Sequence, residues 1–270
     1  MLQPYAGPGL FITGTGTDVG KTMVTAALAA AFQRMHLRVG VCKPVASGCP
    51  KNAARGNEPD RPLGDDDYVS PDALRTVRAA GLDPADEGLM RYASPLRFGA
   101  PTAPSVAARI EGRAPDWRRV ETALDWWQEN CQVLLVEGSG GWYVPLDGHD
   151  YMIADLAAAL RLPVLVVTRA DLGAINETLL TVHAIKERNL AVAGLVINRL
   201  PAAGQRDVAM ETNLQELPRL SGVPVRAVLP EFAASDLSEV QVGAARGVPE
   251  ALVEAMGAFA REWWQLMGAA

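Results

Sequence analysis

The sequence predicts an α/β protein of three layers, in which a mostly parallel central sheet carries helices on both faces. Two observations lead to this fold class. Short apolar runs rich in Val, Ile and Leu alternate along the chain with segments of helical periodicity. Strands that are apolar on both faces and are separated by helices are typical of a parallel sheet buried on both sides. Neither a repeat nor a linker divides the chain, so we expect a single domain spanning residues 1–270.

The individual elements follow from the spacing of the apolar residues. The runs expected as strands are residues 9–13, 38–45, 132–136, 163–168, 193–198 and 225–229. The segments expected as helices are residues 21–35, 102–111, 117–130, 152–160, 175–189, 205–220 and 249–267. Proline, glycine and charged residues crowd residues 50–70, where we expect a mobile surface loop near the functional site. The aspartate run Asp65–Asp67 within it is expected to be solvated.

The composition excludes several classes of function. The net charge is −6, whereas a nucleic-acid-binding protein usually shows a basic stripe. The three cysteines are widely spaced, so neither a zinc site nor a disulfide framework is indicated. No apolar run has the length of a membrane span, and the amino terminus lacks the features of a signal peptide. We therefore expect a cytoplasmic protein that binds neither nucleic acid nor membrane.

The strongest local signal is the glycine-rich run GTGTDVGKT at residues 14–22. It follows an expected strand and opens an expected helix, which is the context of a phosphate-binding P-loop. In such a loop the backbone N–H groups surround phosphate oxygens, Lys21 reaches the β- and γ-phosphates, and the Thr22 hydroxyl can bind Mg²⁺. Five residues lie between Gly14 and the Gly-Lys pair, whereas the usual P-loop has four between its first glycine and that pair. Either the loop is one residue longer, or Thr15 takes the place of the first glycine. The fold class is thus P-loop NTPase-like.

Two further charged residues stand at the carboxyl ends of expected strands. Lys43 stands in the run KPVASG, and Glu137 follows four apolar residues and precedes glycines. Ligands of doubly wound sheets bind at the carboxyl ends of the strands, where these side chains are expected to meet the P-loop. Lys43 is therefore a candidate for a second cation that holds phosphate or substrate. A buried Glu137 needs a partner, which is either Mg²⁺ or a structural Lys or Arg.

Taken together, these runs resemble the dethiobiotin synthetase family. The resemblance is carried by TGTGTDVGKT, KPVASG, PLRFGAPTAP, VEGSGGW, TRADLGAINETLLT and GLVINR, which occur in the family's order between residues 13 and 199. The longer P-loop is itself a feature of that family. The resemblance implies an ATP- and Mg²⁺-dependent cyclo-ligase of biotin biosynthesis. It would convert 7,8-diaminopelargonic acid and CO₂ to dethiobiotin through a carbamate and a carbamic–phosphoric anhydride.

The resemblance also implies roles for individual residues. Lys21 and Lys43 would hold the γ-phosphate and the carbamate, with Thr17 beside them. The positions implied as nucleotide contacts are Gly16, Thr17, Asp18, Val19, Gly20, Lys21, Thr22, Asn198 and Pro230. The positions implied as substrate contacts are Ser47, Gly140 and Asn176, with Asn176 reaching across a homodimer interface to the tail carboxylate of the substrate.

The metal ligands implied by the family are Thr22, Glu137 and an aspartate after the second strand. Asp72 is preferred for that aspartate, because the serine and proline before it can cap and start a helix. Asp67 is the alternative, because the loop after the second strand is longer than in several relatives and the run Asp65–Asp67 resembles another version of the same family element.

Two other classes of function compete with the synthetase. Partition and cell-division ATPases share the extended P-loop and use ATP as a switch for binding DNA or membrane. The expected carboxyl-terminal helix, residues 249–267, carries three glutamates against one arginine, which suits an anionic lipid surface poorly. Amidase-type relatives usually carry a glutaminase domain after the sheet, for which this chain has no room.

Overall fold

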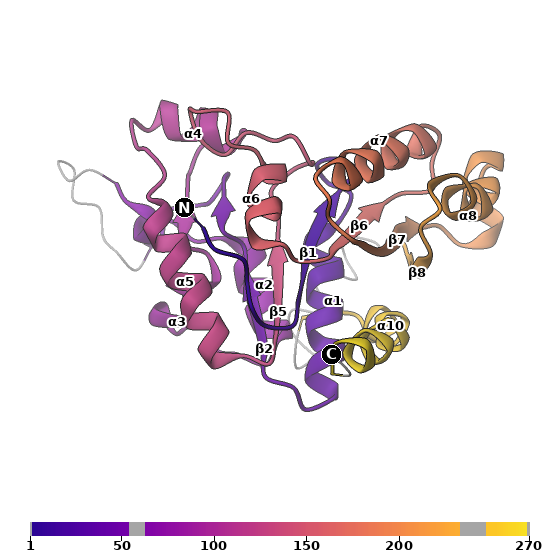
Figure 1. Ribbon diagram of the computed structural model, residues 1–270, viewed down its shortest axis with the longest axis horizontal. Helices are drawn as coiled ribbons and strands as arrows, with labels where there is room; N and C mark the ends of the chain where they lie inside the picture. Colours follow the sequence, from indigo (N-terminus) through magenta and orange to yellow (C-terminus); the bar gives the residue numbers. More distant parts are fainter. Residues whose placement is uncertain (1, 54–62, 233–246, 269–270) are drawn as a thin grey trace.

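The computed structural model describes residues 2–53, 63–232 and 247–268, and its centre is a six-stranded sheet (Figure 1). The strands lie in the order β2-β5-β1-β6-β7-β8, and all neighbouring pairs are parallel. Their bounds are β1 Gly9–Gly14, β2 Val39–Cys42, β5 Val133–Glu137, β6 Val164–Thr168, β7 Val192–Leu200 and β8 Val225–Pro230. The predicted parallel central sheet is confirmed. Part of the predicted loop at 50–70 lies outside the described residues.

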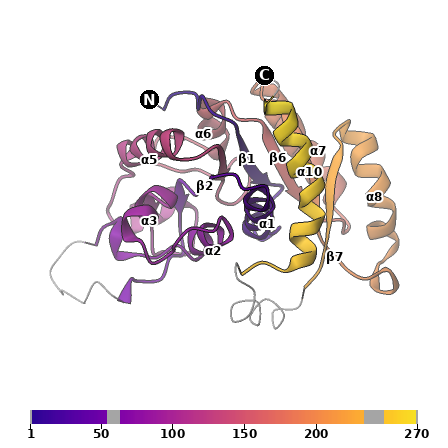
Figure 2. The ribbon, with the colours of Figure 1, turned by 90° about the horizontal axis from the view of Figure 1, so that it is seen from below.

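Helices cover the sheet on both faces, as predicted. Figure 2 shows α1 and α2 on one side of the strands and α6 and α7 on the other, and α1 packs against both α2 and α10. The bounds of the longer helices are α1 Lys21–Arg34, α2 Pro71–Ala79, α5 Trp117–Asn130, α6 Ile153–Leu160, α7 Ala174–Glu187, α8 Val208–Ser221 and α10 Glu250–Gly268. The shorter ones are α3 Glu87–Ala93 and α4 Pro104–Ile110, with single turns at η2 Asp65–Asp67 and η3 Ala203–Gln205.

The packing of α1 against the sheet explains why the P-loop is held firmly. Every residue of β1 is buried, and a run of alanines makes most of α1 buried as well. Small side chains let the helix axis approach the strands closely, while Leu28 and Phe32 fill the remaining space between them. The loop between β1 and α1 therefore joins two elements that have little freedom to move apart.

The strand predicted at residues 38–45 is two strands in different sheets. The first, β2, ends at Cys42, and after Lys43 and Pro44 the chain forms β3, Val45–Ala46, which pairs with β4, Leu96–Arg97. Pro44 has no N–H group to donate to a ladder, and the N–H of Lys43 donates instead to the carbonyl oxygen of Ala93, at 2.8 Å. The break turns the chain at the point where Lys43 must leave the sheet.

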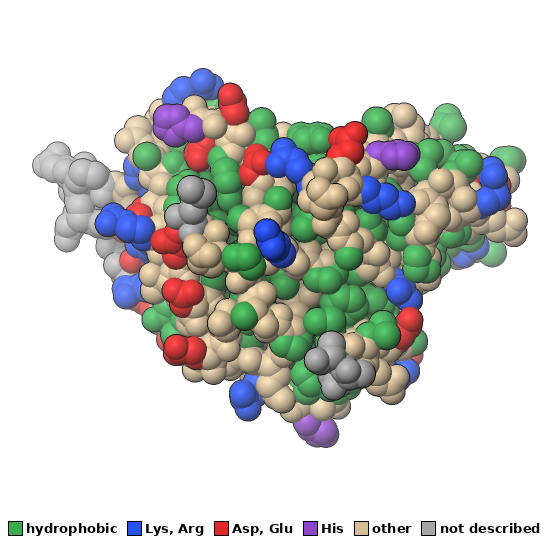
Figure 3. Space-filling view, in the orientation of Figure 1, with side chains coloured by type: hydrophobic (Ala, Val, Ile, Leu, Met, Phe, Trp, Pro, Cys, Tyr) green, Lys and Arg blue, Asp and Glu red, His purple; other side chains and the backbone are tan. Residues whose placement is uncertain are grey.

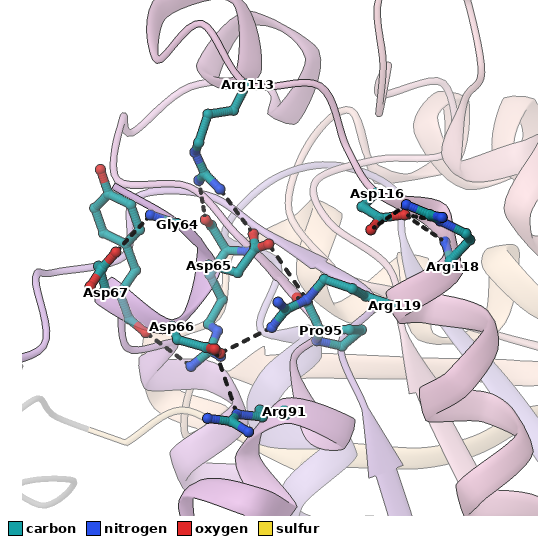
Figure 4. A network of polar contacts seen from close by, with 12 residues as sticks. Gly64, Asp65, Asp66, Asp67, Arg91, Pro95, Arg113, Asp116, Arg118 and Arg119 are labelled. Carbon is teal, nitrogen blue, oxygen red and sulfur yellow. Dashed lines mark hydrogen bonds and ion pairs between the residues drawn. The ribbon is translucent and has the colours of Figure 1, made fainter. Parts of the chain in front are cut away.

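The expectation that the aspartates Asp65–Asp67 are solvated is wrong. Asp65 and Asp67 are buried, and Asp66 accepts hydrogen bonds from Arg97, at 2.8 Å, and Arg119, at 3.0 Å (Figure 4). Arg97 is itself buried. Opposite charges that come from segments far apart in the sequence thus neutralise one another beside the small sheet, which no local pattern reveals.

The surface carries intermingled charges. On the face shown in Figure 3, acidic and basic side chains are scattered among apolar and neutral ones. Ion pairs also join elements at the surface, such as Arg226 of β8 with Glu262 of α10 at 2.8 Å. None of the helices in the described part of the chain combines the length and the apolar character that crossing a membrane requires.

Replacing Asp66 with alanine is expected to lower the free energy of unfolding by about 2 kcal/mol, because buried Arg97 would lose a carboxylate partner. Urea unfolding followed by circular dichroism measures the change. The control is Glu216→Ala, which breaks an exposed ion pair with Arg219 and should leave the unfolding midpoint unchanged. Equal midpoints for Asp66→Ala and the parent protein would contradict this account of the network.

Candidate active site

The loop between β1 and α1 is shaped for an anion. Gly20 has a φ of 94°, and a Cβ atom added there would lie 2.0 Å from Nδ2 of Asn198. Only glycine meets both demands. The same Nδ2 atom donates to the carbonyl oxygen of Val19 at 2.9 Å, so the end of β7 clamps the loop. Gly20 offers no side-chain cap to α1, and the first N–H groups of the helix are free to bind a phosphate oxygen.

Lys21 lies along the inside of this loop. Its side chain is almost fully buried, and Nζ donates to the carbonyl oxygen of Gly16 at 2.9 Å. Burial lowers the pKa of Lys21 to about 8, and the positive charge of Lys43 acts in the same direction, while Glu137 opposes it. The amine is therefore mostly protonated at neutral pH, and it loses its charge in a lower pH range than an exposed lysine does.

Strand register brings Lys43 and Glu137 together. Ile12 of β1 pairs with Glu137, and Cys42 pairs with Val136, so the residue after Cys42 stands beside Glu137. Nζ of Lys43 donates to Oε1 of Glu137 at 2.8 Å. The hydroxyl of Thr22 donates to the same oxygen at 2.8 Å. Three strands and the start of α1 thus converge on one carboxylate.

Asp72 completes this cluster from α2. Ser70 caps that helix, with its Oγ accepting the N–H of Ala73 at 3.2 Å, and Pro71 occupies the first position. Packing of α2 on α1 then brings the Asp72 carboxylate to Nζ of Lys43, with which it forms an ion pair. Asp67, the alternative metal ligand, accepts the N–H of Gly64 at 2.6 Å and does not line the cavity around Lys43.

Charge in the cluster is strongly coupled. Burial alone would lower the pKa of Lys43, but the carboxylates of Glu137 and Asp72 outweigh it and raise that pKa above its ordinary value. Burial pushes the pKa of Asp72 upward, yet Lys43 and the Thr22 hydroxyl hold it below its usual range. Lys43 is consequently a cation and Asp72 an anion at neutral pH.

The cluster also fits a magnesium ion. Oε2 of Glu137 is buried and has no hydrogen-bond partner within the described residues. That oxygen, a carboxylate of Asp72 and the hydroxyl of Thr22 are hard ligands of the kind that Mg²⁺ prefers. No group of three or more His, Cys, Asp or Glu side chains suited to a metal occurs in the described ranges. A Mg²⁺ ion bound with phosphates and water needs only one or two carboxylates.

The side chains line two neighbouring cavities of about 380 and 540 Å³. The first cavity lies at the P-loop, and the residues that line it are Thr17, Asp18, Gly20, Lys21, Thr22, Met23, Lys43, Ser47, Asp72, Glu137, Ser139, Gly140 and Arg199. The second shares Thr17, Asp18, Ser47, Ser139 and Gly140 with it and adds Gly48, Pro101, Thr102, Ala103, Pro104 and Val144. The shared wall would let a ligand in the second cavity meet a phosphate in the first.

Five predicted site residues do not line these cavities, and two of them, Gly16 and Val19, belong to the P-loop itself. Asn176, near the exposed start of α7, lines neither cavity, and its neighbour Leu172 is 90% exposed. Asn198 is buried and bonded to Val19, and Pro230 ends β8 at the surface. The residues 233–246, next along the chain from this segment, lie outside the described ranges.

Several residues of the cavities were missed by the sequence analysis. Arg199 and Met23 line the first cavity, and the segment from Pro101 to Pro104 lines the second. The signal for Arg199 was its place directly after the strand-ending Asn198. Pro101 and its neighbours belong to the run PLRFGAPTAP, which was one of the runs that resemble the family but whose residues were given no function.

Comparison with known proteins agrees with this site. Residues 8–237 match a family model described as an AAA domain. A protein named ATP-dependent dethiobiotin synthetase BioD from Mycobacteroides abscessus is 40% identical over 225 residues, which are 83% of this chain and 88% of the relative. The chain belongs to the dethiobiotin synthetase family. Another such synthetase, from Anaeromyxobacter dehalogenans, is 41% identical over 82% of this chain and 89% of its own.

Solved structures with the same fold include members of other families. A ParA family ATPase from Chlorobium tepidum superposes with a TM-score of 0.55 at 14% identity, covering 95% of this chain and 98% of its own. The MinC:MinD cell division complex of Aquifex aeolicus gives 0.52 at 13% identity, covering 98% and 97%. At such low identity the likeness shows the fold alone, so it bears on the three-layer architecture of this dethiobiotin synthetase family member and not on its activity.

The depressed pKa of Lys21 predicts how ATP binding depends on pH. The protonated amine binds phosphate, so the dissociation constant for ATP should begin to rise as the pH approaches 8 and should rise towards about tenfold per pH unit above it. Titration calorimetry across this range measures the slope, and ATP binding above pH 8 should take up a proton. In Lys21→Arg the guanidinium stays charged throughout, and the slope should vanish. A flat profile for the parent protein would contradict the assignment.

Proposed function

We propose that the chain is a dethiobiotin synthetase that uses ATP to close the cyclic urea of dethiobiotin from 7,8-diaminopelargonic acid and CO₂. Membership of the family makes it an ATP-dependent cyclo-ligase. The observation that carries the proposal is the meeting of Lys21, Lys43, Thr22, Asp72 and Glu137 around one cavity that opens to a second. A role as a nucleotide switch of the partition or cell-division type is not proposed, because the chain resembles those ATPases only in its fold.

The proposed reaction runs in three steps. One amine of the substrate adds to CO₂ and loses a proton, which gives a carbamate. An oxygen of the carbamate attacks the γ-phosphorus of ATP, and the bond from that phosphorus to the oxygen of the β-phosphate breaks. ADP departs, and the product of the transfer is a carbamic–phosphoric anhydride. The second amine then attacks the carbonyl carbon and releases inorganic phosphate. Such steps need positioning and neutralisation of charge more than covalent help from the protein.

Lys21, Lys43 and Thr17 are proposed as the residues that hold the reacting atoms. Lys21 lies along the P-loop, where its ammonium would neutralise the γ-phosphate as it transfers. Lys43 remains protonated beside its carboxylates, so its amine serves as a positive charge and not as a base. Thr17 lines both cavities, which supports a role in contacting both phosphate and carbamate.

Thr22, Asp72 and Glu137 are proposed to hold Mg²⁺. The ion would neutralise the phosphate oxygens and orient them for transfer. Both carboxylates form ion pairs with the Lys43 amine. Binding of Mg²⁺ by the same carboxylates would therefore weaken these ion pairs. Lys43 would then be free to turn toward the carbamate. Apart from the metal, ATP is the cosubstrate.

The remaining contacts are proposed from the family. Ser47 and Gly140 line the wall that the two cavities share and would contact the carbamate side of the substrate. Asn198 and Pro230 would face the base of the nucleotide. A homodimer is proposed in which Asn176 of one subunit enters the site of the other, which agrees with the exposure of the loop before α7.

Turnover with defined substrates tests the function. ADP release should require both diaminopelargonate and bicarbonate, and carbon-labelled bicarbonate should appear in dethiobiotin by mass spectrometry. Lys43→Ala is the matched control: it should still bind ATP and make no product. ATP turnover that continues when either substrate is omitted would contradict the synthetase and favour a nucleotide switch.

Replacing Glu137 with glutamine tests the metal site. The volume of the side chain is kept and its charge is lost, so the Mg²⁺ concentration for half-maximal activity should rise about 10- to 100-fold. Titration of activity with Mg²⁺ measures it, and Glu216→Gln, the same change on an exposed surface, should leave it unaltered. An unchanged Mg²⁺ requirement in Glu137→Gln would favour a purely structural pair with Lys43.

A further inference from the structure

Arg199 is a cation in the phosphate cavity that none of the proposed steps uses. It follows Asn198 at the end of β7, where the pairing of β7 with β8 becomes irregular between Ile197 and Leu200. The side chain of Asn198 is buried and holds the P-loop, whereas Arg199 lines the cavity with Lys21 and Thr22. The fold thus places a guanidinium group directly beside the loop.

The guanidinium of Arg199 is uncommitted. Within the described residues it makes no hydrogen bond, ion pair or ring contact. Asp18 lines the same cavity and is not paired with it. Lys43, by contrast, is occupied by Glu137 and Asp72. Arg199 also has a φ of 55°, a backbone conformation that is uncommon for residues other than glycine.

The position of Arg199 along the loop differs from that of Lys21. The amine of Lys21 reaches Gly16, at the early end of the P-loop, at 2.9 Å. Nε of Arg199 lies 3.8 Å from the point that a Cβ atom on Gly20 would occupy, at the start of α1. Lys21 and Lys43 line the same cavity, where they are proposed to act on the transferred phosphate. Arg199 lies by Gly20 at the start of α1, whose first N–H groups would meet the phosphates that stay on the nucleotide.

We infer that Arg199 is a nucleotide-binding residue that holds a phosphate retained by ADP, while the lysines act on the γ-phosphate. The inference rests on the proposed use of ATP at this site. A guanidinium group binds phosphate oxygens through two parallel N–H groups, which an ammonium group cannot reproduce. The residue therefore sets the affinity for the nucleotide and leaves the chemical step to the lysines.

The test compares Arg199→Ala and Arg199→Lys with a matched control, Arg161→Ala. Arg161 is also exposed, also has a φ of 55°, and ends α6 away from the cavity. Titration calorimetry with ATP and with ADP, without the diamine, should show about tenfold weaker binding of both nucleotides in Arg199→Ala. Arg199→Lys should fall between, and Arg161→Ala should match the parent protein. Added salt should reduce the difference in nucleotide affinity between Arg199→Ala and the parent protein.

Steady-state kinetics complete the test. Arg199→Ala should raise the KM for ATP and keep kcat at saturating ATP, which a loss of folded structure would not do. Unchanged affinity for ADP in Arg199→Ala would overturn the inference, as would an equal loss in Arg161→Ala. Nucleotide binding is measured without turnover. If Arg199→Ala weakened nucleotide binding as expected but the parent protein formed no dethiobiotin, only the proposed function would be contradicted.

Discussion

The site depends on one buried cation shared by two carboxylates. Lys43 lies between buried Glu137 and half-buried Asp72, and neither Lys43 nor Glu137 could be buried alone without a large cost. The cluster therefore works only if the register of β2 with β5, the capped start of α2 and the position of α1 are all correct. Most of the fold around the P-loop can be understood as the means of bringing these groups together while excluding most water.

The fold was predictable where the information is local. Strands such as β5 and β6 are continuous apolar runs, and α1 opens on a P-loop, so their type and order followed from periodicity. The break at Pro44, the short helix α3 and the burial of Asp65 were not foreseen. Each depends on partners far along the chain, namely Ala93, the strand β2 and Arg97. Pro44 offered a local warning in its missing N–H group.

The candidate site was predictable to a similar extent. Lys43 and Glu137 were recognisable because charged residues at the ends of apolar strands meet at one edge of a parallel sheet. Asp72 was favoured by its capping serine and proline, and the structure brings it to Lys43. Arg199 was overlooked, because its relation to Gly20 exists only once β7 lies beside the loop. The roles given to Asn176 and Pro230 rest on the family and still await a test.

The order of the strands has a consequence for biosynthesis. β1 and β2 are made first, but β5 lies between them in the sheet, and no hydrogen-bonded ladder joins β1 to β2 directly. The growing chain must therefore wait for Glu137 to emerge before its first two strands are secured, and for Asn198 before Val19 is clamped. A P-loop encoded within the first few dozen codons is thus completed only after most of the sheet has left the ribosome, and a truncated chain would expose an unfinished apolar edge.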